Sequence, residues 1–179
     1  MSPNHPLLLT TVLLLLLITS AAAKPPPPTP LVQRICKTTA DYPLCVEALY
    51  ADDRTPEADR YVMAFISVGL AYTNATGTRS YISGLAKDHT SRVDRMRLDR
   101  CGSDYDAAIS RLEIAYNDLN SETYFGLASL SGEAARNATD CQAVFSKSTW
   151  RPLGNRNQVL LVLCQVIAYI GKSFTGGGD

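Results

Sequence analysis

Residues 101–119 read CGSDYDAAISRLEIAYNDL, and apolar side chains recur along them at spacings of three and four. The recurring positions are Cys101, Tyr105, Ala108, Ile109, Leu112, Tyr116 and Leu119. Since an α-helix makes one turn about every 3.6 residues, this spacing places all of these side chains on one face. The segment therefore predicts a long amphipathic helix with one buried side.

Three further segments show the same periodicity. The segment before it carries Ala58, Val62, Phe65, Ile66, Gly69, Tyr72, Tyr81, Ile82 and Leu85, and the segment after it carries Tyr124, Leu127, Leu130, Ala134, Ala138, Cys141 and Phe145. Residues 159–170 are apolar except for Gln165, which predicts the most buried helix of the four. No segment alternates with period two, so we expect an all-α fold, a four-helix up-down-up-down bundle.

Helix boundaries are expected at prolines and small polar residues. Thr55-Pro56-Glu57 is typical of a helix start, residues 74–77 suggest a break or kink, and Asn155 is a candidate cap for the last helix. Two shorter helical pieces, 31–38 and 43–50, flank the break Asp41-Tyr42-Pro43. They predict a helical hairpin in front of the bundle.

The first residues predict a secretory leader. Residues 7–18 read LLLTTVLLLLLI and run into the small residues 19–23, a pattern typical of a signal peptide. This run is shorter than the roughly twenty apolar residues that span a bilayer. We therefore expect a signal peptide at 1–23, a Pro-rich spacer at 24–30, the helical domain at 31–171 and a flexible tail at 172–179. The mature protein is expected outside the cell rather than in the vacuole, without a membrane attachment.

Charge and histidine content exclude several functions. Lys and Arg total 17 and Asp and Glu total 17, which leaves no excess of cations for binding nucleic acid. His5 lies in the leader, so the mature chain keeps only His89 and cannot form a multi-histidine metal site. No nucleophile–base or zinc motif is present, and we expect neither catalysis nor a cofactor. A secreted helical carrier or interaction protein without inhibitory activity is the alternative from another class.

Five cysteines suggest two disulfides and one free thiol in a secreted chain, although fifteen pairings are possible. A Cys36–Cys45 bond would clamp the hairpin, and a Cys101–Cys141 bond would staple two antiparallel helices. Cys164 lies in the most apolar segment, where a buried thiol is expected. Two N-glycosylation sequons begin at Asn74 and Asn137.

Several motifs resemble those of the plant invertase and pectin methylesterase inhibitors. They are Ile35-Cys36-x2-Thr39 with Tyr42-Pro43-x-Cys45, Cys101-x3-Tyr105-x2-Ala108-x3-Leu112, and Cys141-x3-Phe145 followed by Pro152-Leu153. The resemblance covers Leu31 to about Gly171. It implies the Cys36–Cys45 and Cys101–Cys141 bridges and a free fifth cysteine. It also implies inhibition of a plant cell-wall enzyme through a 1:1 protein complex.

The resemblance leaves two target enzymes open, pectin methylesterase and acid invertase. Invertase inhibitors of this family carry Pro-Lys-Phe in the turn between the stapled helices, whereas residues 119–125 here read LNSETYF. Pectin methylesterase inhibitors tend to carry a Ser-Ala-Ala stretch, which residues 131–135 (SGEAA) only approximate. The missing triplet favours pectin methylesterase. Candidate contacts to the target are Glu122, Tyr124 and Phe125. Ordinary packing at the bundle end is the alternative for Tyr124 and Phe125, and for Tyr124 it has at least equal weight.

Overall fold

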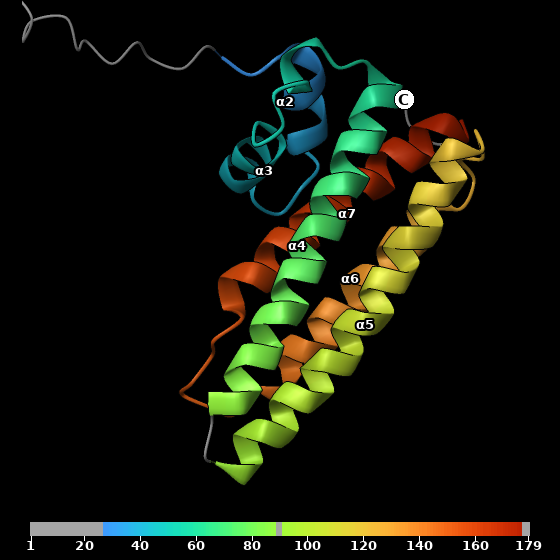
Figure 1. The fold of residues 1–179 in the computed structure, drawn as a ribbon. Helices are drawn as coiled ribbons and strands as arrows, with labels where there is room; N and C mark the ends of the chain where they lie inside the picture. The colour runs from blue at the N-terminus through green and yellow to red at the C-terminus, as the bar shows by residue number, and fades with distance from the viewer. Residues whose placement is uncertain (1–26, 89–90, 177–179) are drawn as a thin grey trace, which may run out of the picture.

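The computed structural model describes residues 27–88 and 91–176, and within them it contains helices and no strand. The helices are α2 (Pro30–Cys36), α3 (Tyr42–Leu49), α4 (Arg60–Asp88), α5 (Arg92–Asn120), α6 (Leu127–Val144) and α7 (Gly154–Phe174), with a 3-10 turn, η1 (Thr55–Glu57), before α4 (Figure 1). The expected all-α class is confirmed. The expected signal peptide, and His89, lie outside the described residues.

The four long helices form a closed ring of neighbours. Helix α4 packs on α5, α5 on α6, α6 on α7, and α7 returns to α4, with successive helices running in opposite directions (Figure 1). This arrangement is the expected up-down-up-down bundle. The hairpin of α2 and α3 lies against α7 and α4 at one side of it.

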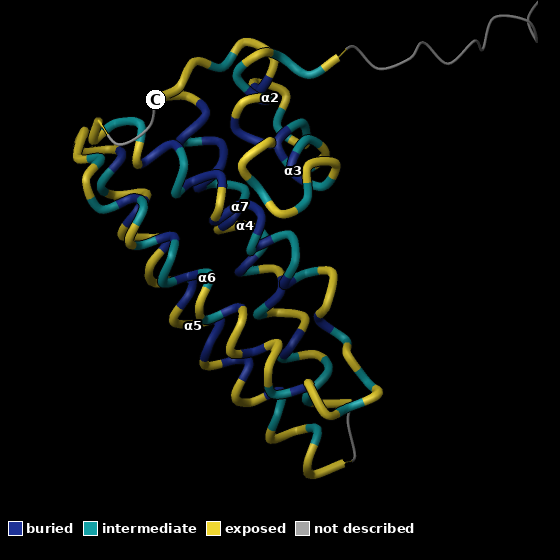
Figure 2. Tube along the Cα trace, turned by 180° about the vertical axis from the view of Figure 1, so that it is seen from behind, coloured by how far each residue is buried: buried dark blue, intermediate teal, exposed yellow. Residues whose placement is uncertain are grey.

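The buried face of α4 is shifted by about one residue along the sequence from the face that the periodicity predicts. The side chains that α4 buries are Met63, Ala64, Ile66, Ser67, Val68, Ala71, Ala75, Thr78 and Ile82. Val62 and Tyr72, which the periodicity assigned to the core, are 37% and 36% exposed. The helix packs between α5 and α7, and the buried face combines small side chains with Met63, Ile66 and Ile82. Figure 2 shows buried and exposed stretches alternating along the bundle helices.

Several expected boundaries were wrong. Helix α4 is continuous through residues 74–77, and it begins at Arg60, where the Asp59 carboxylate accepts a hydrogen bond from the Val62 N–H at 2.8 Å. Thr55 is instead buried and donates its hydroxyl to the Leu49 carbonyl at 2.5 Å. Helix α7 begins at Gly154 without a side-chain cap, so Asn155 does not cap it.

The helices extend beyond the expected limits of the domain, 31 and 171, at both ends. Pro30 is the first residue of α2, a position that tolerates proline because its missing N–H would have no helical partner. The Thr29 side chain caps this helix by accepting from the Val32 N–H. At the other end, α7 continues three residues past the expected limit of the domain, to Phe174.

One polar contact attaches the hairpin to the core helix. Gln165, the polar exception in α7, accepts a hydrogen bond from the Ala40 N–H at 2.8 Å. Cys36 and Cys45 form a disulfide that closes the hairpin. Among the described residues α7 is the one helix long and apolar enough to cross a membrane, but it packs against α4, α6 and the hairpin. Its composition is therefore that of a core helix.

A second disulfide, Cys101–Cys141, joins α5 to α6 with a Cα–Cα distance of 4.5 Å. Near it, the buried Tyr105 hydroxyl donates to the Asn157 side-chain oxygen at 2.6 Å and thereby connects α5 to α7. Cys164 is a free buried thiol, and burial raises its pKa to about 12. The thiol is therefore neutral and unreactive at physiological pH.

Asp104 on α5 makes stability depend on pH. Its side chain is buried and accepts hydrogen bonds from Arg100 Nε at 3.0 and 3.2 Å, but burial raises its pKa, and the charge of Asp140 adds to this. Because the folded state then takes up this proton more readily than the unfolded state, stability should rise as pH falls from neutral toward the unfolded value near 3.8.

We expect Asp104→Asn to remove this increase. Thermal unfolding of both proteins should be measured between pH 7 and pH 4. The Tm of the wild type minus the Tm of the variant should increase by roughly 1–3 °C as pH falls. Asp99→Asn removes an exposed carboxylate from the same helix and controls for net charge. A constant Tm difference across the range would contradict the role of Asp104.

Candidate functional site

The turn between α5 and α6 lies at the end of the bundle where α4 begins and α7 ends (Figure 1). The Thr123 N–H donates to the Asp118 carbonyl at 2.8 Å, which closes the turn. Glu122 adopts φ = 55°, the left-handed region, where a side chain costs about 1–2 kcal/mol. These contacts give residues 121–126 a defined conformation.

Tyr124 is anchored in an aromatic cluster at this end of the bundle. Its ring centroid lies 4.4 Å from that of Phe174 and 5.7 Å from that of Tyr61, so the turn contacts both α7 and α4. Arg60 lies over the Phe174 ring at 4.7 Å and donates to the Ser173 carbonyl at 3.2 Å. The guanidinium thereby adds a cation–π contact to the packing.

The three predicted contact residues are neighbours in the turn but differ in exposure. Phe125 is 80% exposed and Glu122 is exposed, whereas Tyr124 is half-buried. Burial raises the pKa of Tyr124, and the nearby charge of Glu122 raises it further. The structure therefore packs Tyr124 against the bundle end and leaves Phe125 and Glu122 exposed to solvent.

Sequence reasoning missed Arg60, Tyr61 and Phe174 as parts of this site. Phe174 lies in the segment expected to be a flexible tail, and Tyr61 was not among the residues of the face assigned to the core. The available signal was the adjacent basic and aromatic pair Arg60-Tyr61. It does not indicate which distant ring would meet them.

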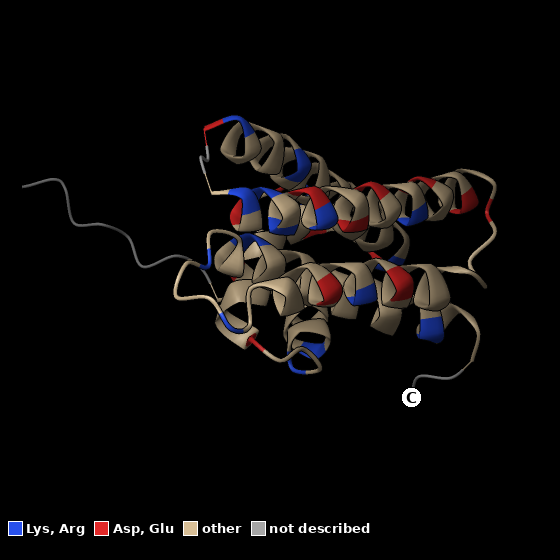
Figure 3. Ribbon diagram, turned by 90° about the horizontal axis from the view of Figure 1, so that it is seen from below, with Lys and Arg blue, Asp and Glu red and all other residues tan. Residues whose placement is uncertain are grey.

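Other candidate groups lie away from this end. The sequon residues Asn74 and Asn137 are partly exposed on α4 and α6, and the Asn74 Oδ1 atom is buried without a hydrogen-bond partner among the described residues. In the described part of the chain no group of three His, Cys, Asp or Glu side chains could hold a metal ion. Figure 3 shows Lys and Arg interspersed with Asp and Glu along the bundle helices.

A family model described as plant invertase/pectin methylesterase inhibitor matches residues 30–170. Among characterised proteins, the chain is 36% identical over 121 residues to the cell wall / vacuolar inhibitor of fructosidase 2 of Arabidopsis thaliana, covering 66% of this chain and 67% of that protein. It is 27% identical over 148 residues to the pectinesterase inhibitor of Actinidia deliciosa, covering 82% and 80%.

A solved structure has the same fold. A mutant form of a pectin methylesterase inhibitor from Arabidopsis superposes with a TM-score of 0.73 at 18% identity, covering 80% of this chain and 97% of that one. The likeness extends over nearly the whole of that structure, so the bundle and hairpin described above form one shared architecture.

Proposed function

The chain belongs to the plant invertase/pectin methylesterase inhibitor family, and from this we propose that it is a secreted inhibitor of a plant cell-wall carbohydrate-active enzyme. It binds non-covalently and 1:1 over the substrate cleft of that enzyme, and it has no catalytic activity of its own. The family match over residues 30–170 carries the proposal. We place the protein in the cell wall, and the vacuole is the other compartment in the name of its fructosidase-inhibiting relative.

The rigidity of the bundle end supports this mode of action. The Cys101–Cys141 bridge fixes α5 to α6, and Tyr124 fixes the turn between them to Phe174. A turn that is already ordered loses less conformational entropy on docking. Phe125 is exposed at the end of this support, and phenylalanine is one of the aromatic side chains whose buried area contributes most to the energetics of an interface.

The first target we propose is pectin methylesterase, because the turn lacks the Pro-Lys-Phe triplet expected of an invertase inhibitor. Instead, it exposes the acidic Glu122 beside Phe125. Acid invertase is the second candidate, and the 36% identity to an inhibitor of fructosidase favours it. Parallel titration of a pectin methylesterase and a cell-wall invertase with the purified protein at acidic pH separates the two.

We expect Phe125→Ala to weaken inhibition of the true target by about tenfold or more, since the exposed ring is the available anchor. The inhibition constant from enzyme titration is the measurement. Thermal stability should remain within about 0.5 kcal/mol, because the side chain has little packing to lose. Met96→Ala is the matched control, since Met96 is 63% exposed near the start of α5, at the far end of that helix.

Two results would contradict the proposal. Failure of the folded wild-type protein to inhibit either enzyme would remove the inhibitory function and favour a helical carrier or interaction protein. Equal inhibition by wild type, Phe125→Ala and Met96→Ala would keep the function but remove the turn from the interface.

A further inference from the structure

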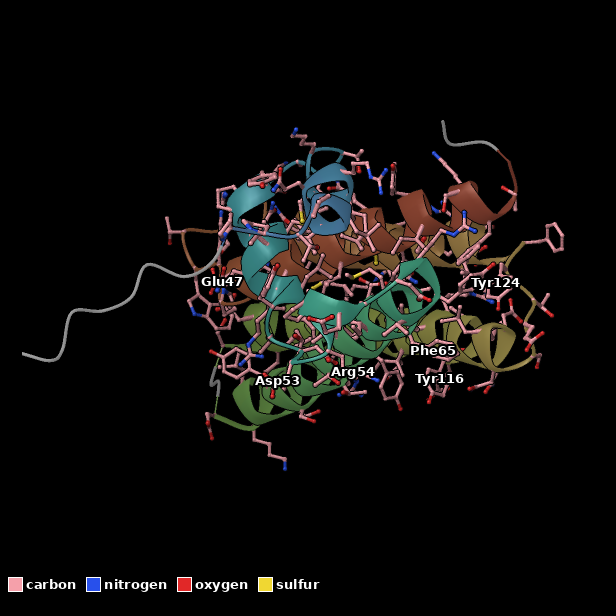
Figure 4. All side chains as sticks on the ribbon, turned by 90° about the horizontal axis from the view of Figure 1, so that it is seen from above. Glu47, Asp53, Arg54, Phe65, Tyr116 and Tyr124 are labelled. Carbon is pink, nitrogen blue, oxygen red and sulfur yellow. A yellow bond between two sulfur atoms is a disulfide. The ribbon has the colours of Figure 1, made fainter. Side chains whose placement is uncertain are left out.

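An open groove of 540 Å³ follows the contact between α4 and α5, and one of its lining residues, Asn117, lies in the last turn of α5. The residues that line it are Gly69, Tyr72, Thr73, Glu113, Tyr116 and Asn117. The Tyr116 ring also packs edge-to-face on Phe65, with their centroids 6.1 Å apart. Figure 4 shows Phe65 and Tyr116 together on one edge of the molecule, on the side where Arg54 lies.

Gly69 lines the groove at a position where the packing does not require glycine. A Cβ built at this position meets no atom within 4 Å, so no close packing excludes a larger residue. Glycine inside a helix costs about 0.5–1 kcal/mol relative to alanine. The missing side chain leaves open the space between Tyr72 and Tyr116, which are 36% and 47% exposed.

The groove contains a carboxylate without a counter-ion. Glu113 accepts a hydrogen bond from the Tyr72 hydroxyl at 3.2 Å and forms no ion pair with any described residue. Arg54, on the same edge, is already bound to Asp52 by two hydrogen bonds of 2.9 and 2.7 Å. The lining of the groove therefore offers a negative charge and two aromatic faces but no positive charge of its own.

We propose that this groove accepts an arginine side chain of the enzyme that the protein inhibits, a partner that rests on the function proposed above. A guanidinium stacks on tyrosine rings and hydrogen-bonds a carboxylate in two places, whereas the compact ammonium of lysine does neither as well. Arginine and tyrosine are also the residues that concentrate binding energy at protein interfaces. The arginine supplies the counter-ion that Glu113 lacks, and its aliphatic stem covers the space at Gly69.

The chemistry of the groove can be tested without the target enzyme. The isotope-labelled protein is titrated by NMR with acetyl-Gly-Arg-Gly-amide and with the same peptide carrying citrulline, the neutral analogue of arginine. We expect the arginine peptide to shift the Gly69 and Glu113 amide signals and to bind about fivefold more tightly than the citrulline peptide. Glu113→Gln should abolish the difference. Glu47→Gln, the same change on the exposed side of α3, should preserve it, since Figure 4 shows Glu47 far from Tyr116.

The docking role is then tested by inhibition. Gly69→Ala and Glu113→Gln should each raise the inhibition constant about tenfold. Two controls should leave the inhibition constant unchanged: Gly84→Ala, at another open helical position in α4, and Glu47→Gln.

Equal binding of the two peptides, or no shift at the solubility limit, would overturn the arginine assignment. If the wild type inhibits and all four variants inhibit equally well, the groove has no role in docking, although the arginine assignment can still stand. An inactive wild type would overturn the proposed function, and the peptide result would still decide the ligand of the groove.

Discussion

The double variant Cys101→Ala/Cys141→Ala should lose about 4 kcal/mol of unfolding free energy, the largest effect of any substitution considered. The two cysteines are 40 residues apart, and removing the bridge releases this whole loop in the unfolded chain. For a domain of this size the loss corresponds to a Tm about 8–16 °C lower. Differential scanning calorimetry on the oxidised proteins measures it.

The hairpin disulfide provides an internal comparison. Cys36 and Cys45 are only nine residues apart, so Cys36→Ala/Cys45→Ala should cost about 3 kcal/mol. All four half-cystines are buried, which makes the packing change similar in both variants. A larger loss for the hairpin pair than for the bundle pair would show that loop length does not determine the stabilisation, and that hairpin docking through Gln165 contributes more.

Gly171→Ala should destabilise the protein by about 1–3 kcal/mol even though alanine is the better helix former. A Cβ at Gly171 would lie 2.9 Å from the Ala128 nitrogen and 2.9 Å from Leu127 Cβ, because the start of α6 is packed directly on α7. Backbone at this distance cannot move aside as a flexible side chain does. Equilibrium unfolding in urea measures the change, read at constant m-value.

Gly84→Ala is the control, and we expect it to change the free energy of unfolding in the opposite direction. Its Cβ meets nothing within 4 Å, so the substitution should stabilise α4 by about 0.5–1 kcal/mol through lower entropy of the unfolded chain. Stabilisation by both variants would mean that α6 shifts away from α7 without cost, contrary to the close packing of these helices.

The helices could be predicted from sequence because their apolar period is strong and each is long. On α5, Cys101, Tyr105 and Leu112 are fully buried as the period requires. Tyr116 fitted the same period and is nevertheless 47% exposed, since it lies at the edge of the face where an amphipathic ring reaches solvent. Periodicity gives the direction of a side chain but not the width of the contact that covers it.

The remaining differences arise from tertiary contacts that join distant residues. Residues 74–77 suggested a break, but Ala75 and Thr78 are buried, and packing on both sides keeps α4 helical there. The candidate contacts Glu122, Tyr124 and Phe125 could be named from the turn alone. Their support could not, because Tyr124 rests on Phe174, fifty residues later in the chain.

The contact between Phe174 and Tyr124 bears on how binding experiments with this protein are built. Helix α7 ends at Phe174, beside the turn that carries Phe125, so a sequence fused to the C-terminus is attached only a few residues after the ring that supports the proposed contact surface. An affinity tag or a sensor-chip linker at the C-terminus would compete with the enzyme for this space. Immobilisation through Lys147, which lies between α6 and α7 at the opposite end of the bundle, leaves the surface accessible.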